Sequence, residues 1–395
     1  MSIFIHLRLM RRLDWSLVIA TLGLLIIGIA FIFSAGYGNP SPAAQQLYLR
    51  QLCWVGLGLL FFLWFAIVDY HRWLRLAWWL YALGVILLVL VFVPHIGLKV
   101  YGAWRWLQIG GFRILQPAEL MKLALIVLLA RLFGLPGRNV RRRRLVLSGL
   151  ALTLLPMALV IKQPDLGTAL VFVPVLAGIM WAAGVPGKRL AILAVLALVM
   201  AGGILALVAL PPKLGMNESD HERLLRRIGF SPYQRERLMV FLDTKRDPLG
   251  AGWNKAQSRI AVGSGRLTGK GYLQGTQNLL GFLPRTVAPN DFIFAVIAEE
   301  KGFVGCVVTL VLYGVLLLAL LRAAEEATDR MGCLLCIGVA AMFFCHVFIN
   351  IAMTIGLLPI TGIPLPLISY GGTFMLGTFV ALGLAQSVYI RGEWR

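Results

Sequence analysis

The sequence predicts an all-α polytopic membrane protein with about ten transmembrane helices, and three observations predict it. Of the 395 residues, 59% are hydrophobic and 14% are charged, and the mean hydropathy is +0.83. Soluble domains have roughly 45–50% apolar and about 25% charged residues. Apolar runs long enough to cross a bilayer recur along the chain. Lys and Arg gather in alternate connections between these runs, as expected when positive charge stays inside the cell.

The apolar runs are the predicted spans. Runs of about 17–25 residues form helices that can cross a hydrocarbon core of roughly 30 Å. The first run is longer than the apolar region of a cleaved signal peptide, and bulky Phe33 stands where a cleavage site needs a small residue, so we expect this run to remain as a span. The runs cover residues 15–36, 52–68, 73–93, 114–133, 145–161, 167–183, 189–209, 292–321, 331–356 and 368–390.

The distribution of basic residues predicts the topology. It puts both termini in the cytoplasm and the long segment 210–290, between the seventh and eighth spans, outside. The 37 Lys and Arg outnumber the 17 Asp and Glu. No soluble domain presents a basic face, so we expect membrane lipid and not nucleic acid as their partner. The predicted cytoplasmic ends carry Arg8, Arg11, Arg12, Arg72, Arg75, Arg131, Arg138, Arg141, Arg142, Arg143, Arg144, Lys188, Arg189, Arg322, Arg330, Arg391 and Arg395.

The segment 210–290 has two parts. The first, "NESDHERLLRRIGFSPYQRERLMVFLD", has charges with apolar residues at helical spacing, which predicts an amphipathic helix near the outer surface. The second is rich in glycine, which permits tight turns and lets backbone N–H groups approach a ligand closely; a flexible surface loop is the alternative. It is not a nucleotide P-loop, because Gly271 follows Lys270 where that motif needs Ser or Thr.

Ionisable residues within spans mark candidate sites, because each costs roughly 2.5–3.5 kcal/mol at the bilayer centre. The fourth span opens with Pro117 and then has Glu119 and Lys122 three residues apart, on one helical face. The two residues form either a structural ion pair or the polar wall of a cavity. Arg105 and Gln116 on the same outer side support the cavity.

Two outer connections also contain polar or irregular sequence. Asp165 in "KQPDLG" is expected mainly to hydrogen-bond its own turn. Prolines interrupt the helical pattern in "GLLPITGIPLPLISYGGT". This stretch forms either an outer hairpin or the wall of a cavity, because irregular backbone at membrane depth needs burial or water.

The stretch "NDFIFAVIAEEKG" places Asp291 before the eighth span. Residues 302–321 can cross the membrane alone, so residues 291–301 would add about 16 Å of helix at the outer interface. Glu299 and Glu300 then become interfacial or structural charges. Asp291 would begin the helix, either as its N-cap or as a carboxylate base for sugar chemistry. No second carboxylate is paired with it, so a two-carboxylate hydrolase is not indicated.

Six motifs in order resemble the SEDS family (shape, elongation, division and sporulation). They are "YGAWRWLQIGGFRILQPAELMK", "QPDLGTAL", "YQRERLMVFLD", "DPLGAGWNKAQSRIAVGSGRLTGKGYLQGTQ", "DFIFAVIAEEKGFVG" and "GIPLPLISYGG". The resemblance covers nearly the whole chain as one integral membrane domain, 1–395, and favours the elongation branch over the division branch. It implies a ten-span glycosyltransferase of the bacterial cytoplasmic membrane that polymerises lipid II on the outer face. The implied partner is a class B penicillin-binding protein, which cross-links the strands.

The resemblance also implies roles for single residues. Asp291 matches the catalytic aspartate, proposed to activate the 4-hydroxyl of the acceptor GlcNAc for attack on C1 of the donor MurNAc, with undecaprenyl diphosphate leaving. Glu119 and Lys122 match a buried acid–base pair, and Arg105 and Gln116 match polar residues of the central cavity.

The leaving diphosphate needs positive charge to stabilise it. Arg259 and Lys270 of the outer loop are candidate substrate-binding cations, together with Arg266 and Arg285. A divalent cation, Mg²⁺ or Mn²⁺, is a candidate cofactor. We assign no metal ligands.

One stretch departs from the family pattern. The family usually has Leu-Pro-Glu upstream of the aspartate and often His-Thr just before it. This chain has "LPRTVAPNDFIF", with Arg285 in place of Glu and with Pro289 and Asn290 before Asp291. No auxiliary role of the missing Glu or His is carried over.

Three alternatives stay open at this point. A lipid II flippase would place its key charges at mid-bilayer and show inverted repeats, whereas this chain gathers its special residues on one side and has no evident repeat. A division-type polymerase of the same family is the second alternative. The third is a scaffold for the penicillin-binding protein, to which no feature of the sequence points.

Overall fold

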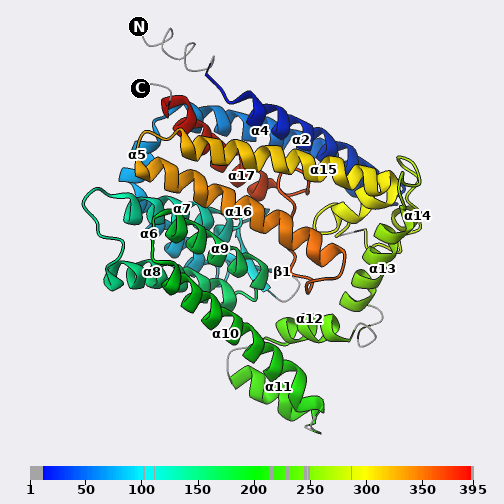
Figure 1. Ribbon diagram of the computed structural model, residues 1–395. Coiled ribbons are helices and arrows are strands. Elements are labelled where there is room, and N and C mark those ends of the chain that lie inside the picture. The colour runs from blue at the N-terminus through cyan, green and yellow to red at the C-terminus, as the bar shows by residue number, and fades with distance from the viewer. Residues whose placement is uncertain are drawn as a thin grey trace.

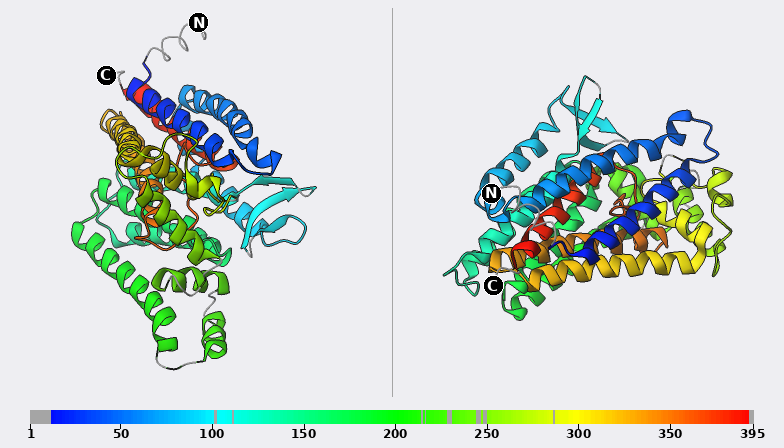
Figure 2. Two further views of the ribbon diagram at one scale, coloured as in Figure 1. Left: turned by 90° about the vertical axis from the view of Figure 1, so that its right-hand side faces the viewer. Right: turned by 90° about the horizontal axis from the view of Figure 1, so that it is seen from above.

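The computed structural model is a bundle of helices with its long axis across the view of Figure 1, and the predicted all-α polytopic class is confirmed (Figures 1 and 2). The structure describes residues 12–100, 103–110, 112–213, 215, 217–227, 231–243, 247, 250–285 and 287–392. Arg8, Arg11 and Arg395, used above to predict topology, lie outside these residues. The elements are α2 (Trp15–Gly36), α3 (Pro42–Gln45), α4 (Leu47–Ile67), α5 (Tyr70–Arg75), α6 (Ala77–Leu90), β1 (Gly97–Val100), β2 (Ala103–Ile109), β3 (Phe112–Leu115), α7 (Pro117–Gly134), α8 (Arg143–Lys162), α9 (Leu166–Ala182), α10 (Gly187–Lys213), α11 (Glu218–Arg227), α12 (Pro232–Leu242), α13 (Ala251–Ser264), α14 (Thr276–Leu279), α15 (Ile293–Glu325), α16 (Arg330–Thr354) and α17 (Gly372–Gly392).

Among the described residues, 7 helices are long and apolar enough to cross a membrane: α2, α4, α8, α10, α15, α16 and α17. The other predicted spans coincide with α6, α7 and α9. The helices α6 and α9 are apolar but shorter, at 14 and 17 residues. The helix α7 carries Glu119, Lys122 and Arg131 among its 18 residues. Within the described part of the chain, each predicted span therefore corresponds to a helix.

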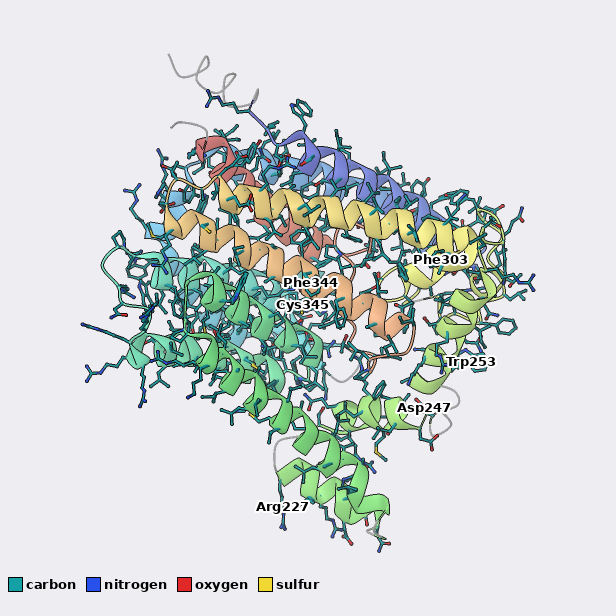
Figure 3. The ribbon with its side chains drawn as sticks, viewed as in Figure 1. Arg227, Asp247, Trp253, Phe303, Phe344 and Cys345 are labelled. Atoms are coloured by element: carbon teal, nitrogen blue, oxygen red, sulfur yellow. The ribbon has the colours of Figure 1, made fainter. Side chains whose placement is uncertain are left out.

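The helices α7, α16 and α17 form the centre of the bundle. In α16 and α17, 72% and 83% of the most apolar window is buried, against 6% in α10, which projects from the bundle toward α11 (Figure 1). Nearly every residue of α7 is buried. Apolar side chains such as Phe303 and Phe344 are exposed on the flanks, as expected for a surface that faces lipid (Figure 3). A central helix can carry charges because protein, and not lipid, surrounds them.

The two ends of the bundle differ in composition. The start of α2 and the end of α17 lie at one end, where Asp14 pairs with Arg322 (3.7 Å) and Asp69 with Arg391 (3.7 Å). The helices α13 and α14 lie at the opposite end (Figure 1). There Ser34, near the end of α2, donates a hydrogen bond to Glu300 (2.5 Å).

The expected single amphipathic helix of the long loop is two helices, α11 and α12. Pro232 begins α12, and Ser231 and Gln234 form a capping box with their side chains and backbones. Arg235 of α12 pairs with Glu222 of α11 (3.1 Å). The loop turns here because a proline after Ser231 starts a new helix and cannot continue an old one.

Between α6 and α7 the described residues form a three-stranded antiparallel sheet in the order β1-β2-β3. The sequence analysis did not predict this sheet. Gly97 pairs with Leu107, and Leu107 pairs with Leu115 on the other side. The strands are short, and their apolar residues resemble the ends of the flanking spans. The sheet places Arg105 on β2.

The eighth span is broken at Gly302, which corrects the expected continuous helix from Asp291. The helix α15 begins at Ile293, and Gly302 has φ 63° and ψ −159°. The part before the break is buried from Ile293 to Glu300, so other parts of the protein surround it. Glycine tolerates this positive φ, whereas a side chain would be strained.

The glycine-rich loop supplies the hydrogen bonds that the break leaves open. Four backbone bonds join the two segments: Phe303 N–H to Arg266 O (2.8 Å), Val304 N–H to Leu267 O (3.0 Å), Lys270 N–H to Glu299 O (3.0 Å) and Gly271 N–H to Glu300 O (3.1 Å). A Cβ on Gly269 would lie 2.2 Å from Glu300 O. The glycines therefore let the loop approach the backbone of α15, and the partner of these N–H groups is the protein itself.

Glu299 and Glu300 have structural places in this arrangement. The Glu299 carboxylate accepts hydrogen bonds from Lys270 Nζ (2.6 Å) and Gln277 N–H (2.9 Å). The Glu300 carboxylate accepts from Ser34 and from Leu273 N–H (3.1 Å). Both glutamates tie the outer loop to the bundle.

Candidate active site

Asp291 lies in the turn that precedes α15. Its N–H donates to Val287 O (2.9 Å), and the N-cap position of α15 is Phe292. No side chain of the described residues caps this helix, so the N-cap interpretation of Asp291 is wrong. Its carboxylate is directed to other neighbours, Gly362 and Arg237 among them.

The backbone around Asp291 is held from the C-terminal part of the chain. Three consecutive carbonyl oxygens each accept a hydrogen bond: Pro289 O from Tyr370 N–H (2.9 Å), Asn290 O from Ser369 Oγ (2.6 Å) and Asp291 O from Asn350 Nδ2 (2.9 Å). These contacts use the main chain of residues 289–291. The unusual residues before Asp291 therefore keep the same backbone support whatever their side chains are.

Gly362 brings Asp291 next to a cation. A Cβ on Gly362 would lie 3.4 Å from Asp291 Oδ2 and 3.4 Å from Arg237 Nη1, so the carboxylate and the guanidinium of α12 meet over this glycine. Gly362 has φ 75°, a conformation that favours glycine. The proline-rich stretch 356–371 therefore borders Asp291 at Gly362 and forms one side of the candidate site.

The charge environment of Asp291 is mixed. Burial raises the pKa of Asp291, and the nearby Asp165 charge raises it further, while Arg237 and Arg105 lower it. The largest of these influences is burial, which disfavours the charged carboxylate. A carboxyl group with a raised pKa is a stronger base once ionised than an exposed aspartate.

Arg105 and Gln116 converge on Asp165. Arg105 Nε lies 3.8 Å from Asp165 Oδ2, and the Arg105 guanidinium also donates to Pro164 O. Gln116 Nε2 donates to the same carboxylate (3.3 Å). Asp165 also caps α9 through Thr168 N–H (3.2 Å), so the expected turn contact is confirmed, but it is one of several. This cluster lies within electrostatic reach of Asp291.

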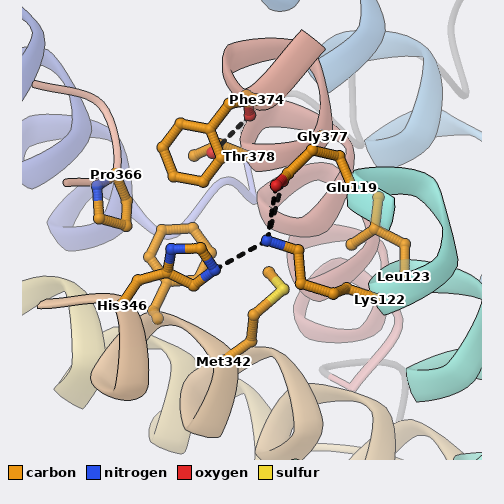
Figure 4. Close-up of a pocket in the computed structure, with 10 residues that line it drawn as sticks. Glu119, Lys122, Leu123, Met342, His346, Pro366, Phe374, Gly377 and Thr378 are labelled. Atoms are coloured by element: carbon orange, nitrogen blue, oxygen red, sulfur yellow. Dashed lines mark hydrogen bonds and ion pairs between the residues drawn. The ribbon is translucent and has the colours of Figure 1, made fainter. Parts of the chain in front are cut away.

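Glu119 and Lys122 form a buried ion pair on α7 (Figure 4). Lys122 Nζ lies 2.9 and 3.0 Å from the two Glu119 oxygens. It also lies 2.9 Å from Nε2 of His346 on α16. The cavity beside the pair has a volume of about 10 Å³, room for roughly one water molecule. The pair therefore acts on its protein neighbours in this structure, and a sugar ring does not fit there.

The candidate cations of the outer loop lie in different surroundings. Lys270 pairs with Glu299 (2.6 Å) and donates to Thr276 Oγ1 (2.6 Å), which makes it part of the loop framework. Arg259 is exposed on α13, with its side chain against Gly356. Arg266 is exposed, and Arg285 donates to Leu279 O (3.5 Å). None of these four is among the charges that affect Asp291 in the described structure.

The sequence analysis assigned no role to Arg237 or Asn350, and it weighed His346 only as a metal ligand beside Cys333, Cys336 and Cys345, an interpretation that helix geometry disfavours. Arg237 belongs to the "YQRERLMVFLD" motif, but its apolar and charged spacing is also that of a surface helix. His346 and Asn350 are four residues apart in an apolar span, and this spacing on one helical face was the available signal. Among the described residues, no three His, Cys, Asp or Glu side chains gather as a metal-binding set.

Comparisons with known proteins cover nearly the whole chain. The family model FTSW_RODA_SPOVE, described as cell cycle protein, matches residues 15–391. The peptidoglycan glycosyltransferase RodA of Treponema pallidum is 34% identical over 430 residues, covering 96% of this chain and 98% of the relative. The peptidoglycan glycosyltransferase MrdB of Escherichia coli K12 is 36% identical over 389 residues, covering 96% and 94%.

Solved structures resemble the chain over a similar extent. A chain from the structure "Structural coordination of polymerization and crosslinking by a peptidoglycan synthase complex" has a TM-score of 0.73 and 31% identity, with 97% of this chain and 99% of that chain covered. The crystal structure of rod shape determining protein RodA from Thermus thermophilus has a TM-score of 0.67 and 28% identity, with 97% and 98% covered.

Proposed function

This chain belongs to the FtsW, RodA and SpoVE family of cell cycle proteins, and we infer that it is a peptidoglycan glycosyltransferase of the RodA type, acting in cell elongation and cell-shape maintenance. We propose lipid II, the undecaprenyl-linked disaccharide pentapeptide, as its substrate. The observation that carries the proposal is the place of Asp291. Its carboxylate does not cap α15, whose N-cap residue is Phe292. It lies beside Arg237, and burial raises its pKa.

In the proposed reaction Asp291 is the general base. It accepts the proton of the 4-hydroxyl of the acceptor GlcNAc as that oxygen bonds to C1 of the donor MurNAc. The bond between C1 and the diphosphate oxygen breaks, and undecaprenyl diphosphate leaves with its electron pair. Arg237 and Arg105 are the cations near Asp291 that would stabilise the developing negative charge.

A divalent cation, Mg²⁺ or Mn²⁺, is a cofactor that we propose for the same site. Mg²⁺ in proteins is usually bound through one or two carboxylates together with substrate phosphates. Asp291 is the carboxylate of the candidate site that would share such an ion with the diphosphate, and the Asp165 charge also acts on it. When bound, the ion would neutralise part of the diphosphate charge. We expect chelation by EDTA to lower polymerisation and added Mg²⁺ to restore it.

We propose that both termini lie in the cytoplasm and that the active face is extracytoplasmic, in the bacterial inner membrane. The basic connections and the two chain ends support this orientation, because Arg322, Arg391 and the start of α2 share one end of the bundle. The helices α13 and α14, which belong to the long loop that precedes Asp291 in the sequence, lie at the opposite end.

The proposed partner is a class B penicillin-binding protein with a transpeptidase that cross-links the strands. Similarity to a chain of a peptidoglycan synthase complex supports this partner. Exposed apolar side chains on α15 and α16, such as Phe303 and Phe348, are compatible with a membrane helix at their side.

Reconstitution with the cognate penicillin-binding protein on lipid II tests the proposal. We expect glycan strands from the native chain and a loss of about 10²–10⁴-fold in rate with Asp291→Asn, the range of general-base catalysis. Asp220→Asn is the matched control, because it removes the same charge from an exposed part of α11. Polymerisation by Asp291→Asn at the native rate would refute the assignment. Lipid II translocation without polymer would favour the flippase alternative.

A further inference from the structure

His346 lies between the buried ion pair and the wall of the candidate site. Its ring is 2% exposed and belongs to α16, a central helix. On one side Nε2 lies 2.9 Å from Lys122 Nζ, and on the other Nδ1 lies 3.3 Å from Pro364 O (Figure 4). The ring of Phe374 covers both groups, 5.1 Å from the His346 ring and 5.5 Å from Lys122 Nζ.

The donors and acceptors determine the tautomer of His346. A lysine ammonium group has three donors and no acceptor, so Nε2 must accept the hydrogen bond from Lys122. The ring hydrogen is then on Nδ1, where it can donate to Pro364 O. Hydrogen bonds consequently run in one direction, from Lys122 through His346 to the carbonyl of Pro364, with Glu119 balancing the charge.

One turn further along α16, Asn350 contacts both sides of the candidate site. Its Nδ2 donates to Ile363 O (2.7 Å) and to Asp291 O (2.9 Å). His346 and Asn350 thus hold adjacent carbonyls, those of Pro364 and Ile363, from one face of one helix. The next residue toward the N-terminus is Gly362, over which Asp291 and Arg237 meet.

We propose that His346 is a positioning residue for the glycosyl transfer: it couples the Glu119–Lys122 ion pair to the 362–364 backbone and so sets the distance between that backbone and Asp291. The proposal rests on the function proposed above. The ion pair orients the His346 ring through the hydrogen bond from Lys122, and without this bond the ring would have one partner fewer to fix its position. Misplacement of a catalytic group by about 1 Å can cost on the order of 100-fold in rate.

Steady-state kinetics of purified variants on lipid II, with the penicillin-binding protein present, test this proposal. We expect His346→Leu to lower kcat about 10- to 100-fold, with KM and the thermal midpoint in detergent near the native values. His346→Gln should recover most of kcat, because its amide offers an acceptor and a donor. Leu154→Ala on α8 is the control, since Leu154 is 55% exposed and lies outside the helices proposed to contact the penicillin-binding protein.

A double-variant comparison separates positioning from simple packing. In a background of Glu119→Leu with Lys122→Met, which removes the ion pair, His346→Leu should cause little further loss of kcat, because both changes interrupt one chain of hydrogen bonds. Full additivity of the two losses would overturn the proposal, as would native kcat in His346→Leu or no recovery in His346→Gln. Asp291→Asn is measured in parallel. If Asp291→Asn stays active, the catalytic assignment of Asp291 fails; if no variant and not even the native chain forms glycan strands, the proposed function fails; if Asp291→Asn is inactive while His346→Leu is native-like, only the positioning role fails.

Discussion

Replacing Lys122 by Met should destabilise the protein strongly. The side chains of Lys122 and Glu119 are 2% and 6% exposed, and the ammonium group lies 2.9 Å from the carboxylate. Removing one partner leaves a buried and uncompensated charge, which costs about 3–5 kcal/mol. The thermal midpoint in detergent, followed by the loss of monodisperse protein, measures the effect. Arg223→Met on α11, where the arginine side chain is 78% exposed, is the matched control and should be nearly neutral.

A second variant tests the reasoning behind that magnitude. With Glu119→Leu and Lys122→Met together no charge is left unpaired, and an apolar pair in place of a buried ion pair is often neutral in stability. We expect the double variant to regain the thermal midpoint but not the native polymerisation rate, because His346 has lost its donor. A native midpoint for Lys122→Met, or a double variant as unstable as the single one, would refute this account.

The remaining predictions concern the candidate site. Gly362→Ala should lower the thermal midpoint, because φ 75° costs a side chain about 1–2 kcal/mol, and should reduce polymerisation by filling the space beside Asp291; native rates would contradict this. Arg237→Leu should lower kcat about 10²–10³-fold through lost charge stabilisation, whereas Arg223→Leu on the exposed face of α11 should not. Burial raises the pKa of Asp291, so the carboxyl group takes up a proton at a pH above its ordinary pKa of 3.8. The polymerisation rate should therefore fall as the pH drops through the raised pKa, and reach its full value at a pH above it. An acid limb at or below 3.8 would contradict that assignment.

Several features could be predicted because they depend on consecutive residues. The length of an apolar run decides whether a helix crosses the bilayer, and each run predicted as a span is a helix in the structure. Asp291 was singled out by the resemblance of the residues around it to the family motif, because its position before an apolar helix was equally that of an N-cap. The pairing of Glu119 with Lys122 followed from their spacing on one helix.

Other features depend on residues that are far apart along the chain. Arg237 meets Asp291 only because α12 is turned toward Gly362, and His346 reaches Lys122 only because α16 packs against α7. The break at Gly302 follows three charged residues, Glu299 to Lys301, but the spacing of residues does not show a change of backbone direction there. The break exists because the glycine-rich loop accepts and donates the hydrogen bonds that the helix gives up. The N-cap interpretation of Asp291 failed for the same reason, because three backbone carbonyls before α15 are held by residues near 350 and 370.

The sequence by itself determined which segments enter the membrane and where charge is placed along them, because hydrophobicity and span length are local properties. Only the tertiary structure decided which charges meet, because contacts between side chains depend on how the helices pack.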